Sequence, residues 1–221
     1  MCKDGALERT APVITLSRLR MQVDGPGVTT LVCFHGCPLR CHWCLNPFSF
    51  DPDTPYTHVT PQELYDRVKL DELYFLSTGG GVTFGGGEPL LQAAFLLDFR
   101  RICGPQWHLC AETSLSLPWE NVAQAAGCID HFYVDCKDTD PDIYRRYTGQ
   151  DNGRMLENLE KLLGLIGPER ITVRIPQIPE FNTAQHQQRS RQYLAEMGIV
   201  NFDLFSYKIP GPRRWKKGSG L

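Results

Sequence analysis

Short apolar segments and helical patterns alternate along most of this chain. Six segments rich in β-branched and aromatic residues are predicted as strands, at 28–34, 81–84, 107–113, 131–136, 170–176 and 201–207. Helices are predicted between them at 60–75, 89–102, 118–126, 154–166 and 183–198, with a short helix after Asp140-Pro141. Such alternation predicts a parallel sheet covered by helices, either a partial barrel or a doubly wound sheet.

Chemically distinctive residues follow the carboxyl ends of these strands. In chain order they are the cysteines of 37–44, Gly86-Gly87-Glu88, Glu112-Thr113, Asp135 with Lys137, and Arg174. Both architectures place their sites at this edge of the sheet. We therefore expect one functional site, built from several loops.

The composition excludes several classes of protein. The chain has 221 residues, a net charge of −2 and 42% hydrophobic residues, which excludes a disordered, collagen-like or coiled-coil protein. The near-neutral charge argues against general nucleic-acid binding. No apolar run approaches the roughly 20 residues of a membrane span, and no secretory signal is visible at the start. Nine cysteines, an odd number, indicate a reducing cytoplasm rather than a disulfide framework.

Three of the nine cysteines, Cys37, Cys41 and Cys44, form a CxxxCxxC motif. Three thiolates on one short loop can converge on a single metal centre. A structural zinc site needs a fourth ligand, which His35 or His42 could supply. An ordinary iron–sulfur cluster also needs four cysteines. The simplest interpretation is a cubane cluster with one iron open to a small molecule, with a Cys3His zinc site as the alternative.

CxxxCxxC followed by GGEP resembles the radical S-adenosylmethionine (SAM) superfamily. More narrowly, the chain is similar to glycyl radical enzyme activating enzymes of the pyruvate formate-lyase activase type. A DGPG turn before the cysteines and DxK and VRxPxIP segments after them carry this narrower resemblance. The matching segments are 23–27, 34–47, 79–83, 86–92, 135–137, 147–149, 173–176 and 178–182.

The resemblance implies a partial (β/α)6 TIM-like barrel in a single domain spanning 13–208, with peripheral termini at 1–12 and 209–221. It also implies one [4Fe-4S] cluster on Cys37, Cys41 and Cys44, with SAM on the open iron. Electron transfer would cleave SAM to a 5′-deoxyadenosyl radical, and that radical would abstract a glycine Cα hydrogen from a partner glycyl radical enzyme. A flavodoxin or ferredoxin would supply the electron, and no protein residue beyond the cluster and SAM would be catalytic.

Five of the implied SAM contacts follow the second and fourth strands. Gly86 and Gly87 lack side chains, so their backbone can approach the methionyl group. Glu88 could accept from the backbone of its own loop or from the methionyl amine, and a plain strand-to-helix turn is the alternative. Lys137 suits the methionyl carboxylate. Asp135, on the same strand face, could bind the ribose or a cation; a surface ion pair is the alternative for both.

The remaining implied contacts also have simpler alternatives. Trp43 would lie beside the adenine or be a core aromatic. Arg174, in an apolar strand, should bind an anion or form an ion pair. Asp24 would lie near the docked glycine loop, or simply form a turn.

Three positions depart from the family pattern. Gly85 replaces the usual Ser before GGE. Glu112 replaces an Asp that contributes to a monovalent-cation site, which puts that cation in doubt. Lys208 replaces a His near the adenine. The other cysteines are interpreted as buried or incidental thiols: Cys2, Cys33, Cys103, Cys110, Cys128 and Cys136.

Two further functions remain open. One is another small radical SAM enzyme, of the 7-carboxy-7-deazaguanine synthase type or the anaerobic ribonucleotide reductase activase type. The other is a non-catalytic metal-binding protein with a zinc site or a degenerate cluster.

Overall fold

One eight-stranded sheet organises the chain, for which a computed structural model describes residues 9–208. The strand order is β3-β1-β2-β4-β5-β6-β7-β8. The strands are β1 (Ala11–Met21), β2 (Val28–Phe34), β3 (Thr57–Val59), β4 (Gly81–Gly86), β5 (His108–Thr113), β6 (His131–Asp135), β7 (Ile171–Gln177) and β8 (Asn201–Ser206). All neighbours from β2 to β8 pair in parallel, which confirms the predicted partial barrel.

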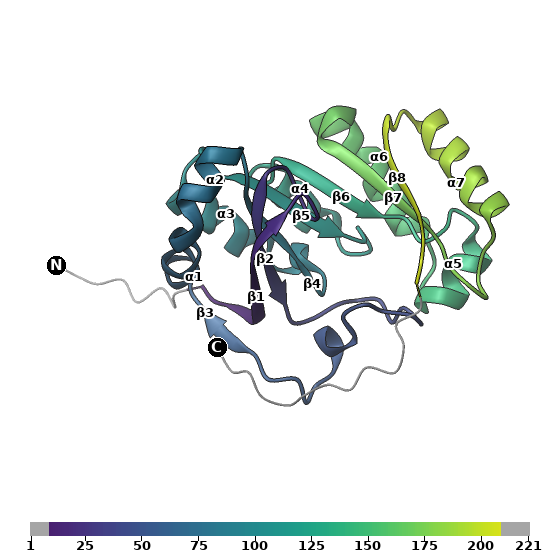
Figure 1. Ribbon diagram of the computed structural model, residues 1–221. Helices are drawn as coiled ribbons and strands as arrows, with labels where there is room; N and C mark the ends of the chain where they lie inside the picture. The colour runs from purple at the N-terminus through teal and green to yellow at the C-terminus, as the bar shows by residue number, and fades with distance from the viewer. Residues whose placement is uncertain (1–8, 209–221) are drawn as a thin grey trace.

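Helices lie along the outer side of the curved sheet (Figure 1). The α-helices are α1 (Pro61–Val68), α2 (Glu72–Thr78), α3 (Ala93–Cys103), α4 (Trp119–Ala126), α5 (Pro141–Thr148), α6 (Gly153–Ile166) and α7 (Ala184–Met197). Short 3-10 helices are η1 (Pro47–Phe50), η2 (Lys69–Asp71), η3 (Pro89–Gln92) and η4 (Pro168–Arg170). Local sequence sets their ends: Thr60 and Glu63 form the predicted capping box of α1, and Gly198 ends α7 in a left-handed conformation.

The strands divide their side chains between a helix-facing core and the barrel interior. On the outer face, Phe84 of β4 packs edge-on against Phe99 of α3 at 5.5 Å between ring centroids. On the inner face, Arg174 of β7 donates to Asp135 of β6 and to Glu112 of β5. The polar interior and the apolar outer layer therefore come from the two faces of the same strands.

The two antiparallel strands at one edge of the sheet were not predicted. β1 pairs with β2, and β3 pairs with β1. β1 carries two register shifts and is largely half-exposed, so its sequence shows no regular alternation. The strand also begins at Ala11, which is fully buried, so residues 11 and 12 belong to the sheet rather than to a peripheral terminus. Residues 9 and 10 are exposed and precede the strand, and the rest of the predicted termini, 1–8 and 209–221 with the basic tail, lies outside the described residues.

The predicted helix at 60–75 is divided into α1, η2 and α2. The division falls at Asp71, whose fully buried carboxylate accepts from Arg18 on β1 and from Thr30 on β2. A single continuous helix would not turn this carboxylate toward both strands. Helical periodicity alone carries no information about such a tertiary contact.

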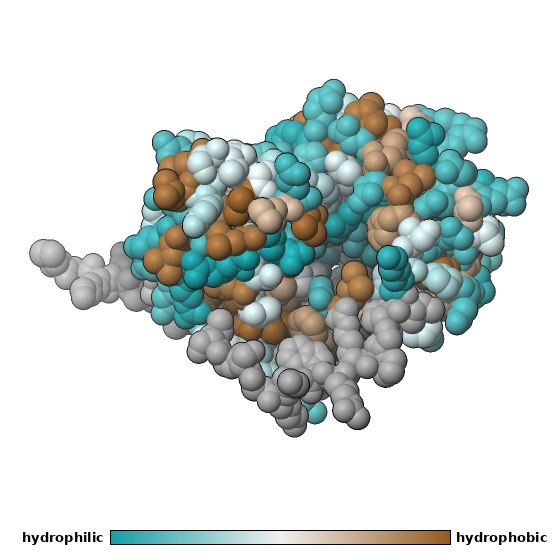
Figure 2. All heavy atoms as spheres, in the orientation of Figure 1, coloured by the Kyte–Doolittle hydropathy of each residue, from teal (hydrophilic) through white to brown (hydrophobic). Residues whose placement is uncertain are grey.

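Apolar side chains remain exposed on the side of the molecule that carries α1 and α2, which contributes brown patches to Figure 2. They include Leu70, Leu73, Tyr74 and Leu76 of η2 and α2. No helix within residues 9–208 is long and apolar enough to cross a membrane.

Candidate functional site

The loop after β2 carries the three motif cysteines and is fixed to the end of α5. Arg40 N–H donates to the Thr148 carbonyl at 3.0 Å, and His42 N–H donates to the Tyr147 carbonyl at 2.9 Å. The Arg40 side chain turns back and donates to the Cys37 carbonyl at 2.6 Å. Protein contacts therefore set the path of this loop between its cysteines.

All three motif thiols are unpaired and partly buried. Burial raises the pKa of Cys37 to about 12 and that of Cys41 to about 11, so their thiolate forms are costly unless a cation compensates them. Bound iron would supply that compensation. Within residues 9–208, no group of three or more His, Cys, Asp or Glu side chains could hold a single metal ion.

The two histidines of the zinc alternative have other neighbours. The His35 ring stacks on Tyr56 at 4.7 Å between centroids, and its Nε2 lies 3.1 Å from the Asp51 carbonyl oxygen. The His42 ring lies against Phe181 at 5.2 Å between centroids. The donor set that remains on the loop is three thiols, which suits a cluster with one iron left open.

The Gly86–Gly87 backbone lies directly against β2 and the cysteine loop. Gly87 N–H donates to the Phe34 carbonyl at 3.0 Å, and Glu88 N–H donates to the Gly36 carbonyl at 2.8 Å. Gly86 has a φ of +86°, and a Cβ there would lie 2.7 Å from Cys33 Cα. Close packing of protein backbone thus already requires glycine here, before any ligand is considered.

Glu88 is 2% exposed, and hydrogen bonds occupy both of its carboxylate oxygens. Oε1 accepts from Thr113 Oγ1 at 2.7 Å and from Leu90 N–H at 3.3 Å. Oε2 accepts from Ser114 N–H at 2.9 Å and from Ser114 Oγ at 2.7 Å. Burial raises the pKa of Glu88, and these donors oppose the rise. Two possible partners were expected for Glu88 from the sequence, the backbone of its own loop and the methionyl amine of SAM. The bond from Leu90 N–H is of the first kind.

Four charged side chains from β5 to the end of β6 and β7 form one network. Arg174 donates to Glu112 at 2.6 Å and to Asp135 at 2.7 Å. Lys137 Nζ donates to Asp135 at 2.9 Å. Of the two interactions expected for Arg174, a bound anion or an ion pair, the structure shows ion pairs. Its guanidinium bonds to both carboxylates at the place considered for a monovalent cation.

Burial and charge act in opposite directions on this network. Burial alone would raise the pKa of Asp135, but Arg174 and Lys137 together hold it well below its usual range. Burial raises the pKa of Glu112, and the opposing effect of the Arg174 guanidinium, to which it is hydrogen-bonded, is smaller. The pKa of Lys137 is raised because Asp135 outweighs the effect of burial. Lys137 therefore stays cationic and can bind an anionic group.

Comparison with known proteins identifies the family. The model of the radical SAM superfamily matches residues 31–188. The chain belongs to the radical SAM superfamily. Curated activating enzymes are similar to it over most of its length. It is 28% identical to the (2S)-3-sulfopropanediol dehydratase activating enzyme of Klebsiella oxytoca, covering 80% of this chain and 74% of that one. It is 30% identical to the pyruvate formate-lyase-activating enzyme of Clostridium pasteurianum, covering 88% and 82%.

Solved structures support the same fold. The crystal structure of Streptococcus suis SuiB matches with a TM-score of 0.60 at 15% identity, over 84% of this chain and 41% of that one. The radical SAM superfamily uses a [4Fe-4S] cluster and SAM, and both curated relatives are glycyl radical enzyme activating enzymes. The chain is thus a radical SAM enzyme of that group.

The other predicted residues lie around this radical SAM core. The Trp43 carbonyl accepts from the Tyr147 and Tyr207 hydroxyls, while its indole Nε1 is buried without a hydrogen-bond partner in the described part of the chain. Asp24 is 6% exposed and pairs with Arg20, and its carbonyl accepts from Thr83 at 2.8 Å. The simpler alternative for Asp24 was a plain turn residue. Its burial and its ion pair with Arg20 go beyond that alternative.

Lys208 is the least integrated of the predicted site residues. It is exposed, and no hydrogen bond or ion pair between described residues joins it to the others. Sequence reasoning also missed Arg20, which pairs with Asp24, Ser114, which donates to Glu88, and Asn158, which donates to the carbonyls of Leu115 and Leu117. Arg20 lies on a strand that was not predicted, and Ser114 lies in an ordinary-looking Ser-Leu-Ser-Leu segment, so only the fold indicates their importance.

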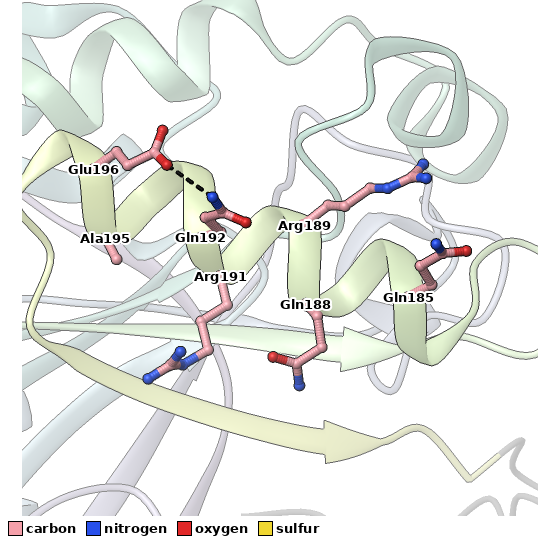
Figure 3. Close-up of a pocket in the computed structure, with 7 residues that line it drawn as sticks. All are labelled: Gln185, Gln188, Arg189, Arg191, Gln192, Ala195 and Glu196. Carbon is pink, nitrogen blue, oxygen red and sulfur yellow. Dashed lines mark hydrogen bonds between the residues drawn. The ribbon is translucent and has the colours of Figure 1, made fainter.

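A separate cavity of about 610 Å³ lies along α7. Gln185, Gln188, Arg189, Arg191, Gln192, Ala195 and Glu196 line it (Figure 3). These side chains belong to one outer helix, and Gln192 bonds to Glu196 on the same helix. The cavity contains none of the predicted site residues.

Proposed function

We propose that this chain is an activating enzyme that uses a [4Fe-4S] cluster and SAM to install a glycyl radical on a partner enzyme. One observation carries the proposal. Three unpaired thiols and the Gly-Gly-Glu loop lie at the same edge of the parallel sheet, joined by backbone hydrogen bonds from Gly87 to Phe34 and from Glu88 to Gly36. The sequence relatives named as activating enzymes support the same conclusion.

Cys37, Cys41 and Cys44 would hold the cluster. Bound there, the cluster and SAM supply reductive cleavage of the SAM carbon–sulfur bond and abstraction of a glycine Cα hydrogen in the partner. The protein contributes position and exclusion of water. Lys137 has two ammonium protons left after its bond to Asp135, and we assign one to the methionyl carboxylate.

The carboxylates and the indole would orient the rest of SAM. Arg174 holds the Asp135 side chain in one place, where its remaining lone pairs can accept from the ribose. The Trp43 ring would lie beside the adenine, with Lys208 near the same end of the ligand. A monovalent cation near Glu112 would have to share its carboxylate with Arg174.

The proposed partners are proteins. A glycyl radical enzyme would present its glycine loop near Asp24, and a flavodoxin or ferredoxin would supply the electron. Eight unpaired cysteines among the described residues fit a reducing compartment, and we propose the cytoplasm.

An anaerobic assay tests the proposal. The protein is reconstituted with iron and sulfide, reduced and mixed with SAM, and 5′-deoxyadenosine is quantified. We expect about four iron and four sulfide per chain, with product from the wild type. Cys37→Ala should yield none. Cys103→Ala, which removes a partly buried thiol outside the motif, should yield as much as the wild type. One zinc without sulfide, or equal product from Cys37→Ala, would contradict the proposal.

A further inference from the structure

The segment 113–117, which begins with the last residue of β5, connects the Gly-Gly-Glu loop with the helices behind the cysteine loop. Thr113 and Ser114 are 2% and 8% exposed, and their hydroxyls reach different oxygens of Glu88. Because an ionised carboxylate only accepts, both hydroxyls must donate to it. Glu88 is therefore held from two sides by adjacent residues.

The same hydroxyls also fix the segment itself. Thr113 Oγ1 accepts from Leu115 N–H at 3.0 Å, and Ser114 Oγ accepts from Ser116 N–H at 3.3 Å. Each hydroxyl thus accepts a hydrogen bond from the backbone N–H two residues ahead and donates one to the Glu88 carboxylate. Both hydroxyls are therefore held by two hydrogen bonds each, and neither is free to rotate.

Leu115 is held in a conformation that a leucine rarely adopts. Its φ is +53°, and its side chain is fully buried. Asn158 of α6 donates to the carbonyls of Leu115 and Leu117, both at 2.8 Å. Residues held in such conformations by their surroundings cluster at active sites and ligand-binding segments.

The segment also touches the support of the cysteine loop. Ser116 Oγ lies 2.8 Å from the hydroxyl of Tyr144 on α5. The last residues of α5, Tyr147 and Thr148, accept from His42 and Arg40 of the cysteine loop. One segment is therefore connected to both loops that would hold SAM and the cluster.

We propose that Thr113 and Ser114 are positioning residues for SAM. They hold Glu88 so that the Gly86–Gly87 backbone stays where the methionyl group binds, and the Glu88 side chain itself does not contact SAM. This inference rests on the proposed function, because it assigns the Gly-Gly-Glu loop to SAM. A loop that is ordered only part of the time binds its ligand more weakly by that fraction.

The chain offers a matched control. Thr30 is also fully buried, and it also donates to a buried carboxylate, that of Asp71, at 2.8 Å. Thr113→Val and Thr30→Val thus remove the same kind of hydrogen bond. Only Thr113 lies beside the Gly-Gly-Glu loop. Ser114→Ala is a milder second variant, because the Ser114 N–H bond to Glu88 remains.

Two measurements test the inference. The first is hydrogen–deuterium exchange of the peptide spanning 85–91 in the protein without cluster or SAM. The second is the dissociation constant of SAM, from the change that SAM causes in the electron paramagnetic resonance spectrum of the reduced cluster. We expect faster exchange in Thr113→Val and Ser114→Ala, and about tenfold weaker SAM binding in Thr113→Val at unchanged iron content. Thr30→Val should match the wild type in both.

The outcomes separate this inference from the proposed function. Exchange at the wild-type rate in Thr113→Val and Ser114→Ala overturns the inference, and so does unchanged SAM affinity in Thr113→Val. Weaker SAM binding in Thr30→Val to the same degree also overturns it, since the effect would then reflect general destabilisation. A wild-type cluster whose spectrum does not respond to SAM overturns the proposed function, whereas the exchange result does not depend on it.

Discussion

The carboxylate of Glu112 fills the space that a side chain at residue 85 would need. A Cβ on Gly85 would lie 3.0 Å from Glu112 Oε2 and 3.3 Å from Leu31 Cδ1. The other Glu112 oxygen bonds to Arg174 at 2.6 Å, so the carboxylate is not free to move away. Gly85 and Glu112, two of the residues expected from the resemblance to differ from the family, are therefore complementary in space.

This relationship predicts that substitutions at 85 and 112 are not additive. Gly85→Ser alone should lower the free energy of unfolding, because the new side chain meets the Glu112 carboxylate. Glu112→Asp should remove that contact, so the double variant should lose less stability than the sum of the single variants. A coupling energy of about 1 kcal/mol is typical for residues in contact. Urea unfolding of the four proteins measures it, and additivity would refute the pairing.

A second prediction concerns the charge network. Arg174→Met leaves Glu112 and Asp135 without a shared partner, and their side chains are 19% and 28% exposed. Removing one member of a buried pair costs about 3 kcal/mol. The loss should be largest at pH 7 and shrink as the pH falls, because protonation then neutralises the two carboxylates, whose pKa values the substitution raises. Equal loss at pH 7 and pH 4 in urea unfolding would argue against this cause.

A third prediction concerns Asp71, which joins η2 to β1 and β2. Burial alone would raise its pKa, but bonds from Arg18 and Thr30 lower it below the usual value. Its contribution to stability is therefore complete above the unfolded-state pKa, near 4, and is lost as the pH falls through the lower folded-state value. We expect Asp71→Asn to cost about 2 kcal/mol at pH 7.

The control for Asp71 is the pH dependence itself. The difference between Asp71→Asn and the wild type should persist down to about pH 4 and diminish below it. Chemical unfolding at a series of pH values provides the measurement. A difference that disappears already at pH 6 would mean that another group is responsible.

A fourth prediction concerns the indole of Trp43. Its buried Nε1–H has no partner among residues 9–208, although buried donors nearly always have one. Trp43→Phe removes this donor along with some packing, so the stability of the cofactor-free protein should change by no more than about 1 kcal/mol. We expect SAM binding to weaken at least about fivefold, from the loss of one hydrogen bond to the ligand. Unchanged SAM affinity would show that the N–H serves no such contact.

The alternation of strands and helices predicted the six parallel strands because each is a short apolar segment separated from the next by a helical pattern. The predicted strand at 28–34 coincides with β2, and the others differ from the observed strands by at most two residues at either end. β1 and β3 were not predicted, because neither belongs to that alternation and neither is a continuous apolar segment. They lie at the edge of the sheet, and β1 mixes apolar residues with Arg18 and Arg20, whose partners lie far away in the sequence or in a turn.

In the candidate site, too, some contacts were predicted from the sequence and others were not. Spacing placed Asp135 and Lys137 on one face, and the structure joins them at 2.9 Å. Spacing could not show that Arg174 binds two carboxylates, because Asp135 and Glu112 lie 39 and 62 residues before it. Nor could it show that Ser114 holds Glu88, which lies 26 residues before it. Such contacts depend on strand order and on the conformation of the connecting loops.

The anchoring of the cysteine loop affects how the enzyme is made. In zinc fingers the metal folds the chain, because nothing else shapes the loop. Here Thr148, Tyr147 and Asn46 fix the loop through polypeptide contacts: two carbonyls of α5 accept from the loop, and the Asn46 amide donates to the Gly86 carbonyl. We therefore expect iron and sulfide to enter an already folded protein as a late maturation step, and a cluster damaged by oxygen to be rebuilt without refolding of the chain.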